Sequence, residues 1–328
     1  MSDDILDHFQ AQESGIDIVI QIIAPVFGLI LLGYLAGRLK WISDAGIDGL
    51  AEFAFNFAIP VMLFTRISSV ALPETVPWEF LAVFYGITLT LFAAALLFGR
   101  KMVGGSSSAA IFSMAGTYSN VILIGIPLVL AALPDAAIVP LFIIVSTHAA
   151  LLFFVTTLFA ERSSGSVSDL QLKTLTVLFK NPIFSAVVMG VLANLAGLSL
   201  PNLVEAPIRT MVDYLSAAAL PCAVFSMGAS ISRYRIEGSL AVISAVLIIK
   251  NLVHPMIVLM VALTLGWDED NRTWLQVALL LSACPTGINV YLFAQRYNAL
   301  EPTIATAVVL STALSVLTLS AVLWWIHA

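Results

Sequence analysis

Long apolar segments separated by short polar loops make up nearly the whole chain. A segment of about 18 or more mostly apolar residues is long enough to cross a bilayer as an α-helix. Ten segments meet this condition: 16–37, 46–67, 78–100, 107–132, 136–160, 182–199, 208–231, 238–266, 274–296 and 302–326. The pattern therefore predicts an all-α polytopic membrane protein with ten transmembrane helices.

Two of the ten segments carry helix-breaking and polar residues near their middle. The fourth contains GTYSNVILIGIP at 116–127, and the ninth contains CPTGINVYLF at 284–293. Proline removes a backbone donor and glycine adds backbone freedom, so both weaken a helix. In hydrocarbon, freed backbone groups are tolerated only where protein or a cavity surrounds them. We therefore expect two broken helices that line a site at mid-membrane depth.

The two halves of the chain resemble each other at four places, in the same order. The matched pairs are APVFGLILLGYLAG (24–37) with NPIFSAVVMGVLAN (181–194), FAIPVMLF (57–64) with AALPCAVF (218–225), AGTYSNV (115–121) with CPTGINV (284–290), and IIVSTHAALL (143–152) with VVLSTALSVL (308–317). We predict two five-helix repeats, 1–160 and 181–328, joined by a cytoplasmic linker at 161–180. Because five is odd, the second repeat must be inverted, and inverted repeats are typical of transporters.

The composition supports a membrane protein and argues against other classes. The chain is 60% hydrophobic and 10% charged, with a mean hydropathy of +1.02, which is far from the usual balance of a soluble domain. The net charge is −6 and there is no basic stripe, so no nucleic-acid partner is expected. Cys222 and Cys284 both lie inside apolar segments, so neither a metal site nor a disulfide is predicted.

Basic residues predict the orientation, because cytoplasmic loops are enriched in lysine and arginine. With the N-terminus outside, the outer side holds only Arg66, Arg209 and Arg272. The inner side then holds ten: Arg38, Lys40, Arg100, Lys101, Arg162, Lys173, Lys180, Arg233, Arg235 and Arg296. We therefore predict a multi-pass protein of the inner (plasma) membrane with both termini outside.

The two broken segments are the best candidates for an anion site. After each break, the N-terminus of the second half-helix should point toward the membrane centre, where unpaired N–H groups attract a carboxylate. The candidate ligands are the amides of Asn120 and Asn289 and the hydroxyls of Thr117, Ser119 and Thr286, with Pro285 and Gly287 shaping the second break. The alternative is that these residues only satisfy the broken helices and bind nothing.

Two basic groups lie inside apolar segments. Lys250 is about twelve residues into the eighth segment, where a charge should face a cavity, a partner or the substrate. It either contributes positive charge to anion binding or coupling, or pairs with a backbone carbonyl and fixes helix packing. His148, in the fifth segment, either responds to pH, since histidine titrates near neutrality, or is a neutral hydrogen-bonded residue of the bundle.

A pair of carboxylates occupies matched positions of the repeat. Glu52 lies eight residues before Pro60, and Asp213 lies eight before Pro221. Carboxylates inside membrane segments can relay protons, so both are candidates for coupling. In the alternative, both reach the headgroups, since each is about two turns from its helix start.

The motifs GTYSNVILIGIPLV (116–129) and CPTGINVYLFAQRYN (284–298) resemble the two crossing-helix motifs of the auxin efflux carrier family. That family holds the plant PIN-formed auxin exporters and bacterial members similar to malonate transporters. The resemblance extends over essentially the whole chain. The chain departs from plant members at Ser119, where they have a proline, so a milder break is expected there. Its linker is also short, which argues against auxin as the substrate.

The resemblance implies a fold like that of the bile-acid sodium symporters, with the fourth and ninth helices crossing at the substrate site. It further implies a scaffold domain from helices 1, 2, 6 and 7 and a transport domain from helices 3–5 and 8–10. Elevator-type movement and a homodimer are implied by the same resemblance.

These features together predict a secondary transporter or exporter of small organic anions, such as mono- or dicarboxylates. The sequence has neither H-E-x-x-H nor G-x-S-x-G, and its histidines are scattered, so no enzyme is predicted. The alternative is a membrane receptor or sensor that binds a carboxylate at the crossing without transport. No cofactor is expected, and coupling to H⁺, to Na⁺ or to the membrane potential remains open.

Overall fold

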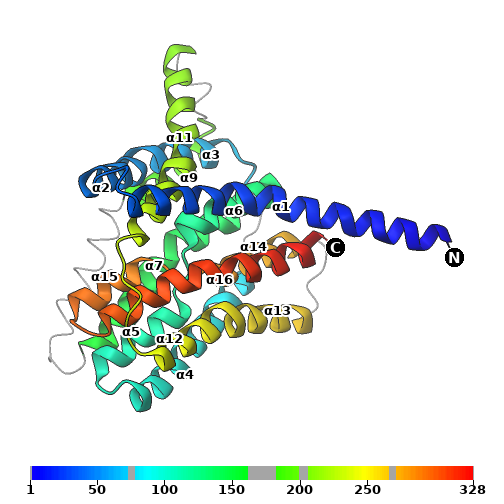
Figure 1. Cartoon of the computed structure of the whole chain (residues 1–328). Helices are drawn as coiled ribbons and strands as arrows, with labels where there is room; N and C mark the ends of the chain where they lie inside the picture. The colour runs from blue at the N-terminus through cyan, green and yellow to red at the C-terminus, as the bar shows by residue number, and fades with distance from the viewer. Residues whose placement is uncertain (1, 73–77, 162–181, 199–205, 266–270, 328) are drawn as a thin grey trace.

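The regular secondary structure of the described part of the chain is helical, apart from one isolated pair of bridged residues. A computed structural model describes residues 2–72, 78–161, 182–198, 206–265 and 271–327. Within these ranges the α-helices are α1 Ser2–Arg38, α2 Asp44–Phe53, α3 Ile59–Ser69, α4 Trp78–Met102, α5 Ser106–Thr117, α6 Ile126–Ala132, α7 Ile138–Ala160, α9 Pro182–Leu195, α11 Ala206–Ile231, α12 Leu240–Leu247, α13 His254–Leu265, α14 Arg272–Ala283, α15 Asn289–Arg296 and α16 Glu301–His327 (Figure 1).

Seven helices of the described chain are long and apolar enough to cross a membrane: Asp17–Arg38, Asp44–Ser69, Trp78–Met102, Asp135–Ala160, Ala206–Ile231, Leu240–Thr264 and Glu301–His327. They match seven of the ten predicted segments. The other three differ in a defined way. The predicted fourth and ninth segments are each broken into two helical pieces, and α9, in the predicted sixth segment, is only 14 residues long.

Within the described ranges, three helical stretches contain a wider, π-helical turn, and each such turn comes shortly before a proline. A proline clashes with the carbonyl four residues earlier and cannot donate a hydrogen bond, so a widened turn accommodates it with less strain. The three turns are η1 Ala54–Ala58 before Pro60, η2 Val121–Gly125 before Pro127, and η4 Ile248–Val253 before Pro255. Two of them, η1 and η4, leave the helix continuous.

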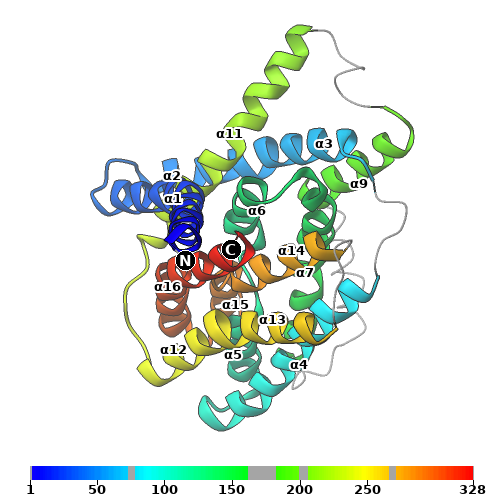
Figure 2. The same cartoon turned by 90° about the vertical axis from the view of Figure 1, so that its right-hand side faces the viewer.

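The helices form two groups that both views separate. One group contains α1, α2, α3, α9 and α11, in the upper part of Figures 1 and 2. The other contains α4, α5, α7 and α12–α16, in the lower part, with α6 at the border between the two groups. The predicted linker at 161–180 would join the sequence halves, but it lies outside the described residues except for Glu161.

Glycines bring α1 into very close contact with α11. A Cβ atom added at Gly33 would lie 2.1 Å from the carbonyl oxygen of Phe225, and one added at Gly228 would lie 2.0 Å from that of Ile30. Small residues let helix backbones approach closely in membranes, where no hydrophobic effect drives helices together. Gly190, which the sequence repeat matches to Gly33, faces α3 from α9 in a less tight contact, where an added Cβ would lie 3.0 Å from Cβ of Ile67.

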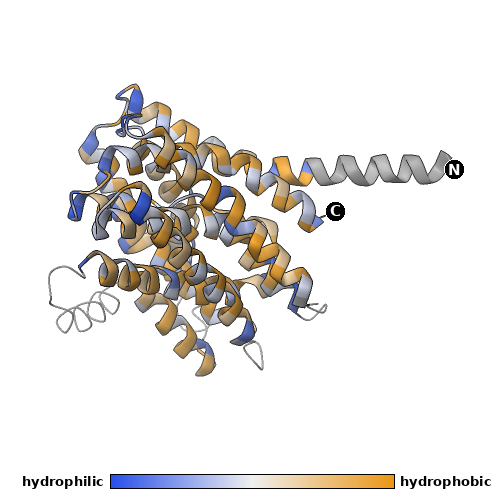
Figure 3. Ribbon diagram, turned by 90° about the horizontal axis from the view of Figure 1, so that it is seen from below, coloured by the Kyte–Doolittle hydropathy of each residue, from blue (hydrophilic) through white to orange (hydrophobic). Residues whose placement is uncertain are grey.

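The N-terminal end of α1 and the C-terminal end of α16 lie at the same end of the molecule (Figures 1 and 2). Hydrophobic residues dominate the helices, and hydrophilic residues concentrate at the helix ends (Figure 3). Placement of both termini on one side agrees with an even number of membrane crossings.

Candidate functional site

The two helix breaks meet inside the molecule. Helix α5 ends at Thr117, and the chain becomes helical again at Val121; α14 ends at Ala283, and α15 begins at Asn289. The first break therefore has three non-helical residues and the second five. The shorter break is the one without a proline, as the sequence predicts.

Backbone hydrogen bonds join the two breaks directly. Ser119 and Thr286 form an antiparallel bridge. The Asn120 N–H donates to the carbonyl of Pro285 at 2.9 Å, and the Gly287 N–H donates to the carbonyl of Tyr118 at 3.0 Å. Each extended segment thus satisfies backbone groups that the other leaves free, which is how broken helices become tolerable at this depth.

Side chains from neighbouring helices occupy further donors at the breaks. The Ser119 N–H donates to Nε2 of His148 at 3.0 Å, and the Thr286 N–H donates to Oγ of Ser311 at 2.9 Å. The side-chain oxygen of Asn120 accepts from the Leu123 N–H at 3.2 Å and so caps η2. The half-helix termini therefore offer fewer unpaired N–H groups than the sequence predicts, because the protein itself uses them.

The predicted asparagines lie together in a small pocket at the crossing. Asn120, Asn289, Ser119 and Gly287 line a cavity of about 50 Å³, together with Tyr118 and with Phe55 of η1. A water molecule takes about 30 Å³ of liquid, so this space admits one or two waters and no dicarboxylate. A carboxylate can therefore enter only if the pocket widens.

The donors of the two asparagines differ in their present partners. Asn289 Nδ2 donates to the hydroxyl of Tyr118 at 3.0 Å. Asn120 Nδ2 points at the sulfur of Met227 at 3.4 Å, which is a weak acceptor that an anion can replace. The amide of Asn120 is therefore the freer of the two donors, whereas the amide of Asn289 already has a hydrogen-bond acceptor.

The three predicted hydroxyls divide into two kinds. Thr117 Oγ1 donates to the Ser113 carbonyl at 2.8 Å, and Thr286 Oγ1 donates to the Ala115 carbonyl at 2.9 Å, and neither lines the pocket. Ser119 lines the pocket, and its buried Oγ has no hydrogen-bond partner within the described chain. Of these three hydroxyls, Ser119 Oγ is therefore the one that has no hydrogen-bond partner within the described chain.

Lys250 lies behind the second break and does not line the crossing pocket. Its side chain is fully buried, and Nζ donates to the carbonyl of Ser282 at 2.6 Å. Nζ also lies 3.4 Å from Nδ1 of His254. This geometry corresponds to the pairing with a backbone carbonyl that the sequence left as one alternative.

His148 supports the first break from the side. Its ring is fully buried, stacks on Tyr118 with centroids 5.1 Å apart, and accepts the Ser119 N–H. Because Nε2 accepts, the proton of the neutral ring must be on Nδ1, which has no partner within the described residues. The contacts are those of a hydrogen-bonded bundle residue that positions Ser119.

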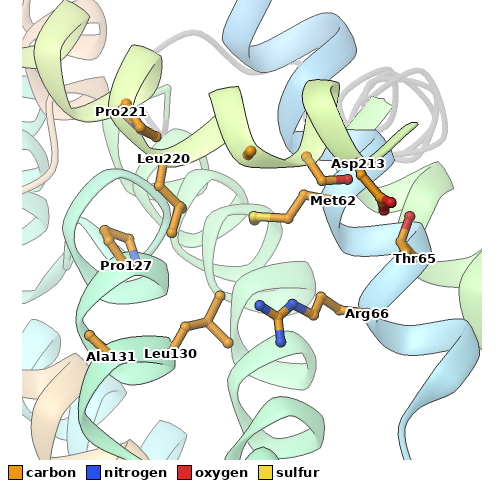
Figure 4. Close-up of a pocket in the computed structure, with 11 residues that line it drawn as sticks. Met62, Thr65, Arg66, Pro127, Leu130, Ala131, Asp213, Leu220 and Pro221 are labelled. Carbon is orange, nitrogen blue, oxygen red and sulfur yellow. The ribbon is translucent and has the colours of Figure 1, made fainter. Parts of the chain in front are cut away.

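The matched carboxylates lie away from the crossing. Glu52 is exposed on α2, and Asp213 is exposed on α11. Asp213 borders a second pocket of about 650 Å³ between α3, α6 and α11, together with Arg66, Pro127 and Pro221. In this pocket the guanidinium of Arg66 points from α3 toward Leu130 of α6, while Asp213 lies beside Thr65 (Figure 4).

Among the pocket residues that were not sequence candidates, three bear on the access or binding of an anion: Phe55, Tyr118 and Arg66. Tyr118 lies inside the motif at 116–127, so its place in that motif could have identified it as a site residue. Arg66 contributed only to the charge count, because a charge near the end of a segment usually reaches the headgroups. Nothing in the sequence distinguishes Phe55 from the other aromatic residues of its segment.

Ser311 and its repeat mate Ser146 provide a matched test of the crossing. Ser311 Oγ accepts the Thr286 N–H and donates to Asn251 Oδ1 at 2.8 Å, whereas Ser146 Oγ donates only within its own helix, to the Phe142 carbonyl. Ser311→Ala should lower the free energy of unfolding by about 1–2 kcal/mol, because it leaves a buried N–H without a partner. Ser146→Ala should have a much smaller effect. Thermal unfolding in detergent measures both; equal losses would contradict this role of Ser311.

Comparison with known proteins identifies the family of the chain. The sequence model of a family described as "Membrane transport protein" matches residues 18–323, which is nearly the whole chain. The chain belongs to this family of transport proteins, the auxin efflux carrier family. The family resemblance predicted from the two crossing motifs is thereby confirmed.

Several curated proteins are similar along most of the chain. A protein of Rhizobium meliloti (strain 1021) described as "Putative malonate transporter" is 29% identical over 308 residues, covering 94% of this chain and 95% of that protein. An "Uncharacterized transporter" of Methanothermobacter thermautotrophicus is 24% identical and covers 90% of this chain and 95% of its own length. The "Lysosomal cholesterol signaling protein" of Mus musculus is 25% identical over 88% of this chain, which spans only 35% of that longer protein.

Proposed function

We propose that the protein is a secondary transporter of small organic anions, mono- or dicarboxylates, and that it binds them at the crossing of the two broken helices. The observation that carries the proposal is the placement of Asn120 and Asn289, matched residues of a repeat, in one buried pocket of a membrane transport protein. The similarity to a protein described as a malonate transporter favours dicarboxylates.

The architecture we propose has ten membrane-spanning segments in two inverted repeats, 1–160 and 181–328, as in bile-acid sodium symporters. Support comes from matched glycines: Gly33 brings α1 onto α11, and Gly190 brings α9 onto α3. Helices α1 and α3 belong to the first repeat, and α9 and α11 belong to the second. Each contact therefore joins the first helix of one repeat to the second helix of the other, as an inverted repeat requires.

Movement between the two helix groups would give access to the site. We assign α1, α2, α3, α9 and α11 to a scaffold domain. The transport domain consists of the third to fifth and the eighth to tenth predicted segments, that is, 78–160 and 238–326. Both pockets lie at the border: Phe55 and Arg66 come from the scaffold side, whereas Asn120, Asn289 and Pro127 come from the transport side. An elevator-type displacement would withdraw Phe55 and admit a carboxylate to the amides of both asparagines and to Ser119 Oγ.

The proposed setting is the plasma membrane, with both termini outside and the protein acting as a homodimer. Because the inside of the cell is negative, the membrane potential assists export of an anion: moving one charge across 100 mV changes its free energy by about 2.3 kcal/mol. The binding-only receptor remains the alternative function.

Arg66 should collect anions from the outer side. Its guanidinium projects into the pocket of about 650 Å³ that leads between the two helix groups. Arg66→Gln should raise the KM for carboxylate uptake about 3- to 10-fold at low ionic strength, and added salt should shrink the difference, because exposed charges are screened. Arg272→Gln, which removes a charge of the same predicted side outside this pocket, is the control. A salt-independent change, or an equal effect of the control, would contradict this role.

Uptake into proteoliposomes tests the proposed function. Purified protein would be given labelled malonate and a panel of other carboxylates under imposed pH, sodium and voltage gradients, with protein-free liposomes as the control. The proposal expects saturable uptake of at least one carboxylate that follows a gradient. Saturable binding without flux would support the receptor, and neither binding nor flux would overturn the anion assignment.

A further inference from the structure

A lysine buried among helices is the least expected residue of the described chain. Lys250 has no exposed surface, although a charge in the membrane interior is costly without a partner. The titratable groups that face it are His254 of α13, His148 of α7 and Cys284 of the second break. No carboxylate is among these facing groups, and Nζ is held by the Ser282 carbonyl oxygen and the His254 ring nitrogen.

The oxygen atom that holds Lys250 belongs to the end of a helix. Ser282 lies in the last turn of α14, and its carbonyl accepts from Nζ at 2.6 Å. The last carbonyls of a helix have no intrahelical partner and carry partial negative charge. Lys250 comes from η4, a widened turn that places this side chain and Asn251 toward α14 and α16.

Helix ends of this kind bind metal cations in other transporters. Where a membrane helix is broken, the carbonyls at the C-terminal end of its first half are common ligands of Na⁺. In this protein the ammonium group of Lys250 occupies that position, at a hydrogen-bonding distance typical of a charged donor. The ammonium group of Lys250 therefore lies against the negative end of α14.

We propose that Lys250 is a tethered substitute for a transported metal cation: it fills a cation site at the end of α14 and makes transport independent of Na⁺. Removal of the ammonium should expose a site for Na⁺ or Li⁺, built on the Ser282 carbonyl and completed by water. The statement about transport rests on the proposed function, whereas the statement about the cation site does not.

Thermal unfolding of purified full-length protein in detergent tests the cation site without any substrate. Tm would be compared in NaCl, LiCl and choline chloride at equal ionic strength. Wild type should show no difference between these salts. Lys250→Ala should be less stable than wild type and should gain about 3 °C or more in NaCl over choline chloride, because a ligand that binds only the folded state raises Tm.

Two further variants make the test decisive. Lys250→Ser adds a hydroxyl ligand and should show the same sodium-specific gain, which keeps the test available if the alanine variant does not fold. Lys101→Ala removes an exposed lysine at the end of α4 and should show no such gain. A sodium-specific gain in wild type, or the absence of a gain in both Lys250 variants, would overturn the proposal.

Flux provides the second arm. If carboxylate uptake is established, wild-type uptake should be equal in sodium and choline media, and uptake by Lys250→Ser should rise at least threefold on adding Na⁺. Sodium-dependent uptake by wild type would contradict the tethered-cation proposal while leaving the transport function standing. If no carboxylate is transported, the thermal result still decides whether the end of α14 is a cation site.

Discussion

Replacing both Asn120 and Asn289 by alanine should reduce carboxylate flux about 100-fold or more, because each amide is expected to lose a hydrogen bond to a charged group worth about 1.5–3 kcal/mol. The substitution should leave the protein folded. Its structural cost comes mainly from the cap on the Leu123 N–H and the bond from Asn289 to Tyr118, about 1 kcal/mol each, because the contact of Asn120 with the Met227 sulfur is weak. Initial rates of uptake per folded molecule in proteoliposomes measure the effect.

Asn194→Ala separates loss of stability from loss of the site. Asn194 donates to the carbonyls of Ile67 and Val70 at 2.8 and 2.7 Å, so its removal also costs two hydrogen bonds, but it does not line the crossing pocket. Flux per folded molecule should therefore survive in this variant. Normal flux in the double asparagine variant would show that the crossing is structural only.

Gly228→Ala should be the most destabilising small substitution in the group of α1, α3, α9 and α11. The added Cβ would lie 2.0 Å from the carbonyl oxygen of Ile30, and a backbone atom cannot move aside without separating α1 from α11. Overpacking of this kind typically costs about 1–3 kcal/mol, and contact with backbone places this case at the upper end. Thermal unfolding in detergent should show a lower Tm and less folded protein after purification.

Gly28→Ala is the matched control on the same pair of helices. A Cβ at Gly28 of α1 would meet no atom within 4 Å, so its Tm should not fall. If Gly228→Ala and Gly28→Ala have equal stability, the close contact of α1 with α11 is not a determinant of the fold.

The sequence alone predicts much of this fold because hydrophobic length and helix breakers act locally. Apolar runs locate the membrane segments, and Pro285 with Gly287 marks a break that the structure contains. The repeat then relates Asn120 to Asn289, which the structure places in one pocket. These features depend on which residues occur along the chain, and not on how each helix is rotated.

The details that the sequence does not predict depend on helix rotation and packing. Whether Lys250 turns toward the pocket or toward the Ser282 carbonyl depends on the position of α14 beside η4. The sequence does not specify this position, because these helices are apolar on all sides. The same holds for Ser311 and His148, which occupy the backbone donors that a free helix terminus would offer to an anion. Phe55, which limits the pocket, comes from a helix with no sequence link to the crossing.

The most direct test of the central claim is equilibrium binding of labelled malonate to purified protein in detergent, since binding separates recognition from movement. The account predicts saturable binding to wild type, loss of that binding in the Asn120→Ala/Asn289→Ala variant, and its retention in Asn194→Ala. Unchanged malonate affinity in the double asparagine variant would contradict the claim that the crossing of the two broken helices is the anion site.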